Sequence, residues 1–121
     1  MSVRSDVAAL IRPALPAGWL FYDHDKSVGA VGKPTAILAR SRVAPGPYVG
    51  SLANTMTLVV IDPTQAEDGM DDRLDDHLDV LIPILQGIAH LEFIEAERGT
   101  YPSDNPTYPA WSISLAVTTT A

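Results

Sequence analysis

Apolar residues recur every three or four positions through residues 66–89, and this spacing predicts the main helix of the chain. With successive residues placed about 100° apart, one apolar band contains Met70, Leu74, Leu78, Leu81, Leu85 and Ile88. The far side carries a continuous stripe of aspartates: Asp68, Asp72, Asp75 and Asp79. His77 falls at the edge of the band. Pro83 falls on the outer side, where the lost backbone hydrogen bond predicts a kink.

The rest of the pattern predicts a short N-terminal helix and five strands. Ser2 or Ser5 can cap the helix, which Pro13 and Pro16 close. Residues 110–119 alternate most clearly, since Trp111, Ile113, Leu115 and Val117 point one way, which is typical of a half-buried strand. Apolar and β-branched stretches predict the other strands at 19–23, 34–43, 52–62 and 91–97.

The order of these elements is helix, three strands, helix, two strands. Short connections between consecutive strands favour an antiparallel or mixed sheet. We therefore expect a single α+β domain over residues 1–121, with a sheet of about five strands and two helices packed on one face. A chain of 121 residues can bury enough surface to fold without a metal or disulfide.

The composition excludes several kinds of site and segment. The absence of cysteine excludes disulfides, a thiolate nucleophile and a cysteine-ligated zinc site. No apolar run approaches the roughly 20 residues of a membrane span. Arg12, Pro13 and Pro16 break the N-terminal apolar stretch, so we expect no signal peptide and a reducing cytoplasm.

Charge is unevenly distributed along the chain, whose formal net charge is −7. Eight of the fifteen acidic residues lie between Asp62 and Asp79, whereas six of the eight lysines and arginines lie within the first 42 positions. Such an acidic chain is poorly suited to gripping nucleic acid by its phosphates. Separated charge of opposite sign instead permits head-to-tail contact between copies.

The aspartates of the main helix could bind a divalent metal through Asp72, Asp75, Asp76 or Asp79. Calcium loops, however, place their acids on a tight loop with a turn glycine, and here the spacing is helical with Gly69 before the acids. His77 has no second histidine four residues later, as a helical zinc motif requires. A solvated helix face is the favoured interpretation.

Other candidates for chemistry are weaker. The stretch at 23–25 places His24 between Asp23 and Asp25, which favours a polar surface loop over a general-base pair. The glycines of 29–33 lack phosphate-loop spacing. Arg40 and Arg42 lie two apart on the predicted second strand, hence on one face, either solvated or meeting carboxylates of a neighbouring copy. We therefore expect no enzyme, but a structural or assembly protein.

In the order of its elements, in length and in its alanine- and proline-rich composition, the chain resembles the tail terminator (tail completion) proteins of long-tailed phages. This group is related to the lambda tail terminator, and the resemblance is to its actinobacterial phage type. The resemblance spans nearly the whole chain. It rests on "SVRSDVAALIRPALPAGWLFY", "PTAILARSRV", "TLVVIDP" followed by "AEDGMDDRLDDHLDVLIPIL", and the closing "AWSISLAVTT".

The resemblance implies a virion tail protein without cofactor or catalysis. Copies, usually six, would form a ring at the head-proximal end of the tail tube, end tube polymerisation and join the tail to the head connector. DNA would pass through the lumen without specific binding, and an acidic lumen would let it slide. The alternatives are another neck or minor tail component, or a small metal-dependent enzyme that uses the acids of 68–79.

The loop at 43–51 is the expected contact with the tube or a neighbouring subunit, and we expect it to be mobile in the isolated protein. Its prolines and glycines make it longer than a tight hairpin needs, and Tyr48 is its one large side chain. The alternative is a plain surface loop with Tyr48 folded back on the sheet. The full set of interface candidates is Arg40, Arg42, Pro45, Tyr48, Asp72, Asp75, Asp76 and Asp79.

Overall fold

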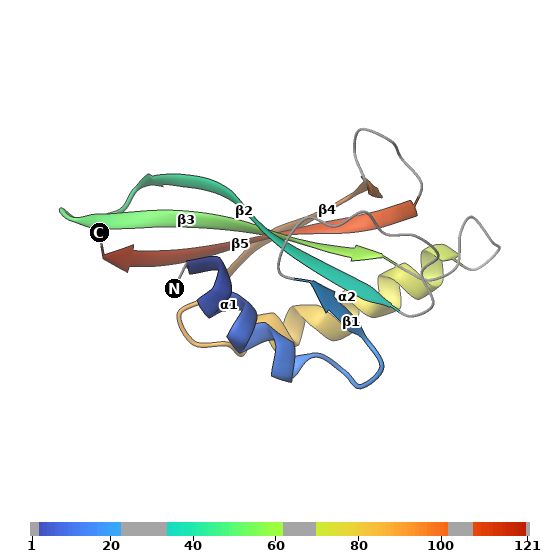
Figure 1. Ribbon diagram of the computed structural model, residues 1–121. Coiled ribbons are helices and arrows are strands. Elements are labelled where there is room, and N and C mark those ends of the chain that lie inside the picture. The colour runs from blue at the N-terminus through green and yellow to red at the C-terminus, as the bar shows by residue number, and fades with distance from the viewer. Residues whose placement is uncertain (1–2, 23–33, 62–69, 102–107, 121) are drawn as a thin grey trace.

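The computed structural model describes residues 3–22, 34–61, 70–101 and 108–120 (Figure 1). The helices are α1 (Val3–Ile11), extended by a 3-10 turn η1 (Arg12–Ala14), and α2 (Met70–Gln86). The strands are β1 (Leu20–Tyr22), β2 (Thr35–Pro45), β3 (Ser51–Ile61), β4 (Glu92–Tyr101) and β5 (Tyr108–Thr120).

The strands form one mixed sheet in the order β1-β2-β3-β5-β4. β1 runs parallel to β2, and every other neighbouring pair is antiparallel. The predicted α+β class is confirmed. The order of strands in the sheet differs from their order in the chain, because the last strand, β5, lies between β3 and β4. β5 therefore has a strand on each side, which suits the run of apolar and hydroxyl side chains along it.

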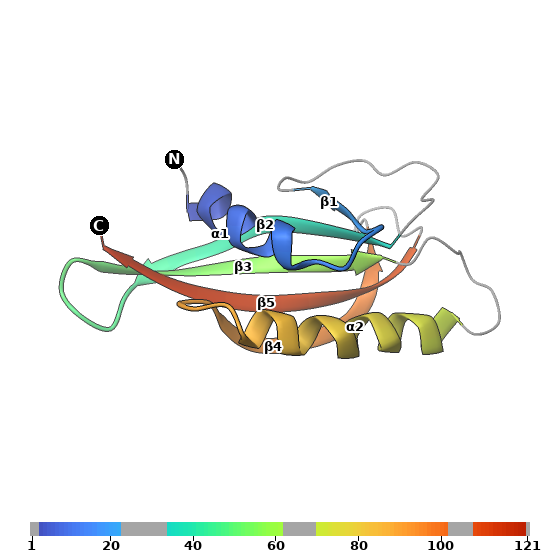
Figure 2. The same cartoon turned by 90° about the horizontal axis from the view of Figure 1, so that it is seen from below.

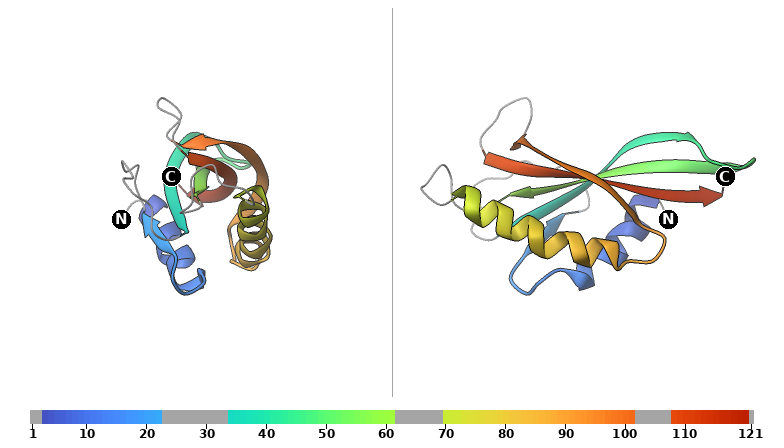
Figure 3. Two further views of the ribbon diagram at one scale, coloured as in Figure 1. Left: turned by 90° about the vertical axis from the view of Figure 1, so that its right-hand side faces the viewer. Right: turned by 180° about the vertical axis from the view of Figure 1, so that it is seen from behind.

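Both helices cover the same face of the sheet (Figures 2 and 3). α1 packs on β2, whereas α2 packs on β3, β5 and β4. Each helix presents one apolar stripe, as the periodicity predicts. The residues that the two stripes and the strands bury in a single core include Val7, Ile11, Leu38, Met56, Leu58, Leu78, Leu81, Leu85, Ile113 and Leu115.

The main helix ends earlier than predicted, at Gln86 and not at residue 89. The backbone N–H of Gly87 donates to the carbonyls of Pro83 and Ile84, at 3.1 and 3.2 Å, and closes the last turn. Glycine favours helix ends because it loses more backbone freedom inside a helix than other residues do. The chain then turns, with His90 at a φ of 68°, before β4 begins.

Several strand ends also differ from the prediction. β2 continues to Pro45 and β3 begins at Ser51, so residues 46–50 alone connect them. β4 runs on to Tyr101, beyond the predicted end at residue 97. Pairing with a neighbouring strand accounts for these extensions, since ladder hydrogen bonds hold residues whose own strand preference is weak. The hairpin of β2 and β3 consequently projects beyond both helices (Figure 2).

Candidate assembly surfaces

The tip of the β2–β3 hairpin exposes apolar surface on an ordered turn. The N–H of Gly46 donates to the carbonyl of Ser51 at 3.0 Å, and the N–H of Ser51 donates to the carbonyl of Tyr48 at 3.1 Å. Gly50 takes the positive φ, 82°, that the tight turn demands. Ser51 is 5% exposed, and its hydroxyl donates to the Tyr48 carbonyl at 2.6 Å. The turn thus holds Tyr48 and Val49 out in solvent, 57% and 104% exposed.

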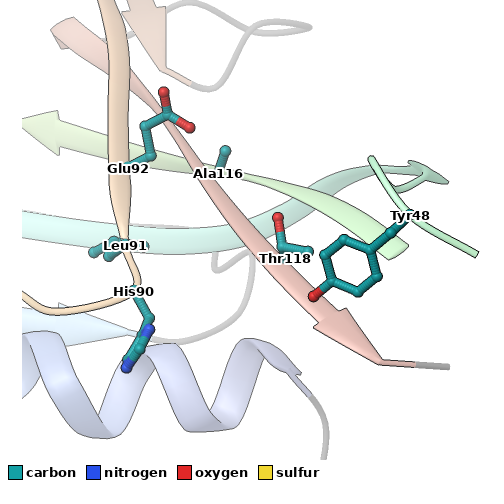
Figure 4. Close-up of a pocket in the computed structure, with 6 residues that line it drawn as sticks. All are labelled: Tyr48, His90, Leu91, Glu92, Ala116 and Thr118. Atoms are coloured by element: carbon teal, nitrogen blue, oxygen red, sulfur yellow. The ribbon is translucent and has the colours of Figure 1, made fainter. Parts of the chain in front are cut away.

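A shallow depression of about 400 Å³ lies between this tip and the start of β4 (Figure 4). Its lining residues come from the tip, from the α2–β4 connection, from β4 and from β5: Tyr48, His90, Leu91, Glu92, Ala116 and Thr118. In Figure 4 the Tyr48 ring lies beside Thr118. Tyr48 therefore leans over the end of the sheet but remains more than half exposed. The lining of the depression combines the polar Tyr48, His90, Glu92 and Thr118 with the apolar Leu91 and Ala116.

The acidic face of α2 points to solvent, as its spacing indicated. Asp72, Asp75, Asp76 and Asp79 are all exposed, and Leu74, on the opposite stripe, is fully buried. Within the described ranges, no three histidine, aspartate or glutamate side chains come together as a metal site would need. His77 sits at the edge of the apolar stripe as predicted, and its ring meets Trp19 edge to face with centroids 5.1 Å apart. That contact joins α2 to the segment before β1.

The alternation of β2 breaks between Arg40 and Arg42, so their two-residue spacing does not establish a shared face. β2 has a bulge between them, so Arg40 pairs with Met56 whereas Arg42 pairs with the next residue of β3, Thr55. Met56 belongs to the helix-covered core, and Thr55 lies on the other face. The hydroxyl of Ser41, the extra residue, donates to the carbonyl of Thr55 at 3.0 Å. An inserted residue reverses the alternation of side chains along a strand, which spacing in the sequence does not reveal.

The fold places the two charge groups on opposite sides of the molecule. One side, formed by α1, β1 and β2, contains four arginines and one aspartate in residues 3–22 and 34–45. The other, formed by α2 and β4, contains eight acidic and two basic residues in 70–101. Arg98, one of those two, stacks over the Trp111 ring at 5.9 Å. Opposite charge on opposite sides is the arrangement that lets identical subunits meet side by side.

The bulge on the outer strand β4 was not predicted from the sequence. Its register shifts between Phe93 and Glu95, so Ile94 is an extra residue, 50% exposed, and the strand carries a bulge of its own. Glu92, Glu95 and Glu97 are exposed beside it. The signal that could have revealed the bulge is the adjacent pair of large apolar residues at 93 and 94, which breaks strict alternation.

Several predicted features lie outside the described residues. They are the polar loop with Asp23, His24 and Asp25, the glycines of 29–33, and the first acids of the main helix, Glu67 and Asp68. In the part of the chain that is described, no helix is long and apolar enough to cross a membrane. Compared with known proteins, the chain matches no family model and no curated sequence.

Proposed function

We propose that this protein is a ring subunit at the head-proximal end of a phage tail tube. There it ends tube polymerisation and joins the tail to the head connector. The observation that carries the proposal is the charge opposition across the sheet, with arginines on the α1–β2 side and carboxylates on the α2–β4 side. Two different complementary surfaces on one chain make a heterologous contact, and such contacts close into rings or continue as filaments.

The projecting hairpin supports a second contact, with the tail tube protein. It stands clear of the helices that cover the sheet (Figure 1), and its tip exposes Tyr48 and Val49. Aromatic side chains of this kind anchor protein interfaces, because they bury a large area at a low cost in conformational entropy. The lateral sides would then join copies into the ring, usually of six, while the hairpin reaches along the ring axis.

A ring built in this way needs no cofactor and performs no catalysis. Its partners are copies of itself, the tube protein and the connector, and DNA passes through its lumen. The acidic stripe of α2, with Asp72, Asp75, Asp76 and Asp79 exposed, repels phosphate wherever it lines that passage.

Tail assembly with and without the protein tests this function. Without it, electron micrographs should show tubes of uncontrolled length and no head attached. Adding the purified protein to tubes should cap one end with a ring and stop further growth. Tubes of normal length in its absence, or no binding to tube ends at any salt concentration, would contradict the proposal. Normal tube length with failure only of head joining would indicate another neck component.

A further inference from the structure

Among the described residues, each side of the sheet ends in a strand with an unpaired edge. In that part of the chain β4 pairs only with β5, and β1 covers β2 only from Thr35 to Ile37. From Leu38 onward β2 has no strand on that side among the described residues. An open edge presents backbone N–H and C=O groups that can pair with another chain. The two open edges lie on opposite sides of the molecule (Figure 3).

The two edges carry matching features of opposite charge. On β2, the bulge at Ser41 is followed by Arg42 and by Val43, which is 46% exposed. On β4, the bulge residue Ile94 is 50% exposed and precedes the exposed carboxylate of Glu95. Each edge thus offers one branched aliphatic side chain next to one charge. Bulges also twist an edge and limit indiscriminate pairing with other strands.

The strand directions and faces allow the sheet to continue from one copy to the next. β2, β3, β5 and β4 alternate in direction, so β4 of one copy would lie antiparallel to β2 of a copy in the same orientation. Arg42 pairs with Thr55 and Glu95 with Ser114, and Thr55 and Ser114 both lie on the face away from the helices. Arg42 and Glu95 therefore face the same side in a continued sheet and can meet.

We propose that the β4 edge of one copy docks antiparallel on the β2 edge of the next, with Ile94 against Val43 and Glu95 against Arg42. This inference rests on the proposed function and names its lateral contact. The aliphatic pair supplies buried apolar area, and the charges fix which edge meets which. β1 confines the contact to Leu38–Pro45, which staggers each copy relative to the next along the strands.

Engineered cysteines test the contact directly, because the chain contains none of its own. Val43→Cys and Ile94→Cys proteins with different tags are mixed at high concentration and on cognate tail tubes, then oxidised. Residues in contact should form a disulfide, which requires Cα atoms within about 7 Å. We expect mixed dimers of the two variants, and from the double variant a ladder that ends at the ring number. The matched control is Val80→Cys, equally exposed at 48% but on α2, which should not cross-link to Val43→Cys.

A charge swap supplies the second test. Arg42→Glu and Glu95→Arg should each weaken association about tenfold, since a weak attraction becomes a repulsion. A mixture of the two variants should recover association, because every contact between unlike copies again joins opposite charges. If rings form on tubes but Val43→Cys and Ile94→Cys do not cross-link, the edge contact is wrong and the proposed function survives. If no copy associates with another in solution or on tubes, both proposals fall.

Discussion

The part of the sheet beneath the helices and the part that projects beyond them differ in how deeply their apolar side chains are buried. Under the helices, Met56, Leu58 and Leu115 are fully buried. Toward the hairpin tip, Val43 of β2 and Val49 of the turn are 46% and 104% exposed. Apolar side chains in the first region stabilise the monomer, whereas those in the second contribute little to it. Apolar surface that folding leaves exposed is available to a partner.

The projecting end is held by hydrogen bonds and not by a core. Asn54 is fully buried, and its side-chain amide donates to the carbonyl of Val117 at 3.2 Å and to the hydroxyl of Thr119 at 3.0 Å. The Ser51 hydroxyl fixes the turn in the same way. Each such bond contributes only about 1 kcal/mol net, but buried polar groups fix a single geometry. A hairpin so constrained keeps its shape without a helix behind it.

The largest effect that the comparison predicts is a difference between Leu58→Ala and Val43→Ala. Leu58 is fully buried between the helices and the sheet, so its truncation should lower the free energy of unfolding by about 2 to 5 kcal/mol. Val43→Ala, on the same sheet but exposed, should change it by less than about 0.5 kcal/mol. Urea denaturation followed by circular dichroism measures both. Equal losses in the two variants would mean that the projecting end is packed as tightly as the body.

These two regions also differ in how far the sequence predicts them. Alternation at Trp111, Ile113, Leu115 and Val117 identified the core face of β5, and helical spacing identified the buried leucines of α2, because burial on one side imposes a period. The bulges at Ser41 and Ile94 depend on pairing with other strands, so no regular spacing of apolar residues in the sequence predicts them. The same holds for the position of β5 between β3 and β4. Fold class was therefore predictable, while the break in alternation between Arg40 and Arg42 was not.

The next largest effect on stability is expected in the turn, where Gly46→Ala is compared with Gly99→Ala. A Cβ at Gly46 would overlap the Ser51 hydroxyl oxygen and lie 2.9 Å from the Ser51 backbone carbonyl carbon. Gly99 has nothing within 4 Å of the same position. We expect Gly46→Ala to destabilise the protein by about 1 to 3 kcal/mol through overpacking. Gly99→Ala should be neutral or slightly stabilising, because alanine restricts the unfolded chain.

Thermal unfolding of the two glycine variants, measured side by side, tests that difference. The expected order of midpoints is Gly46→Ala below the parent and Gly99→Ala at or above it. A Gly46→Ala protein with the parent midpoint would show that the turn adjusts freely around Ser51. The projecting end would then be a compliant loop, in agreement with the expectation from composition that residues 43–51 are mobile.

The smallest effect on stability, and the largest on assembly, is expected from Tyr48→Ala. The side chain is 57% exposed beside Thr118 (Figure 4), so its loss should change the free energy of unfolding by less than about 0.5 kcal/mol. If Tyr48 anchors the tube contact, capping of tubes should weaken by at least about tenfold, the loss typical of a central aromatic at an interface. Tyr48→Phe is the matched control, since it keeps the ring and removes only the hydroxyl. Capping by Tyr48→Ala at the parent rate, with normal folding, would remove the hairpin tip from the assembly surface and leave only the lateral edges.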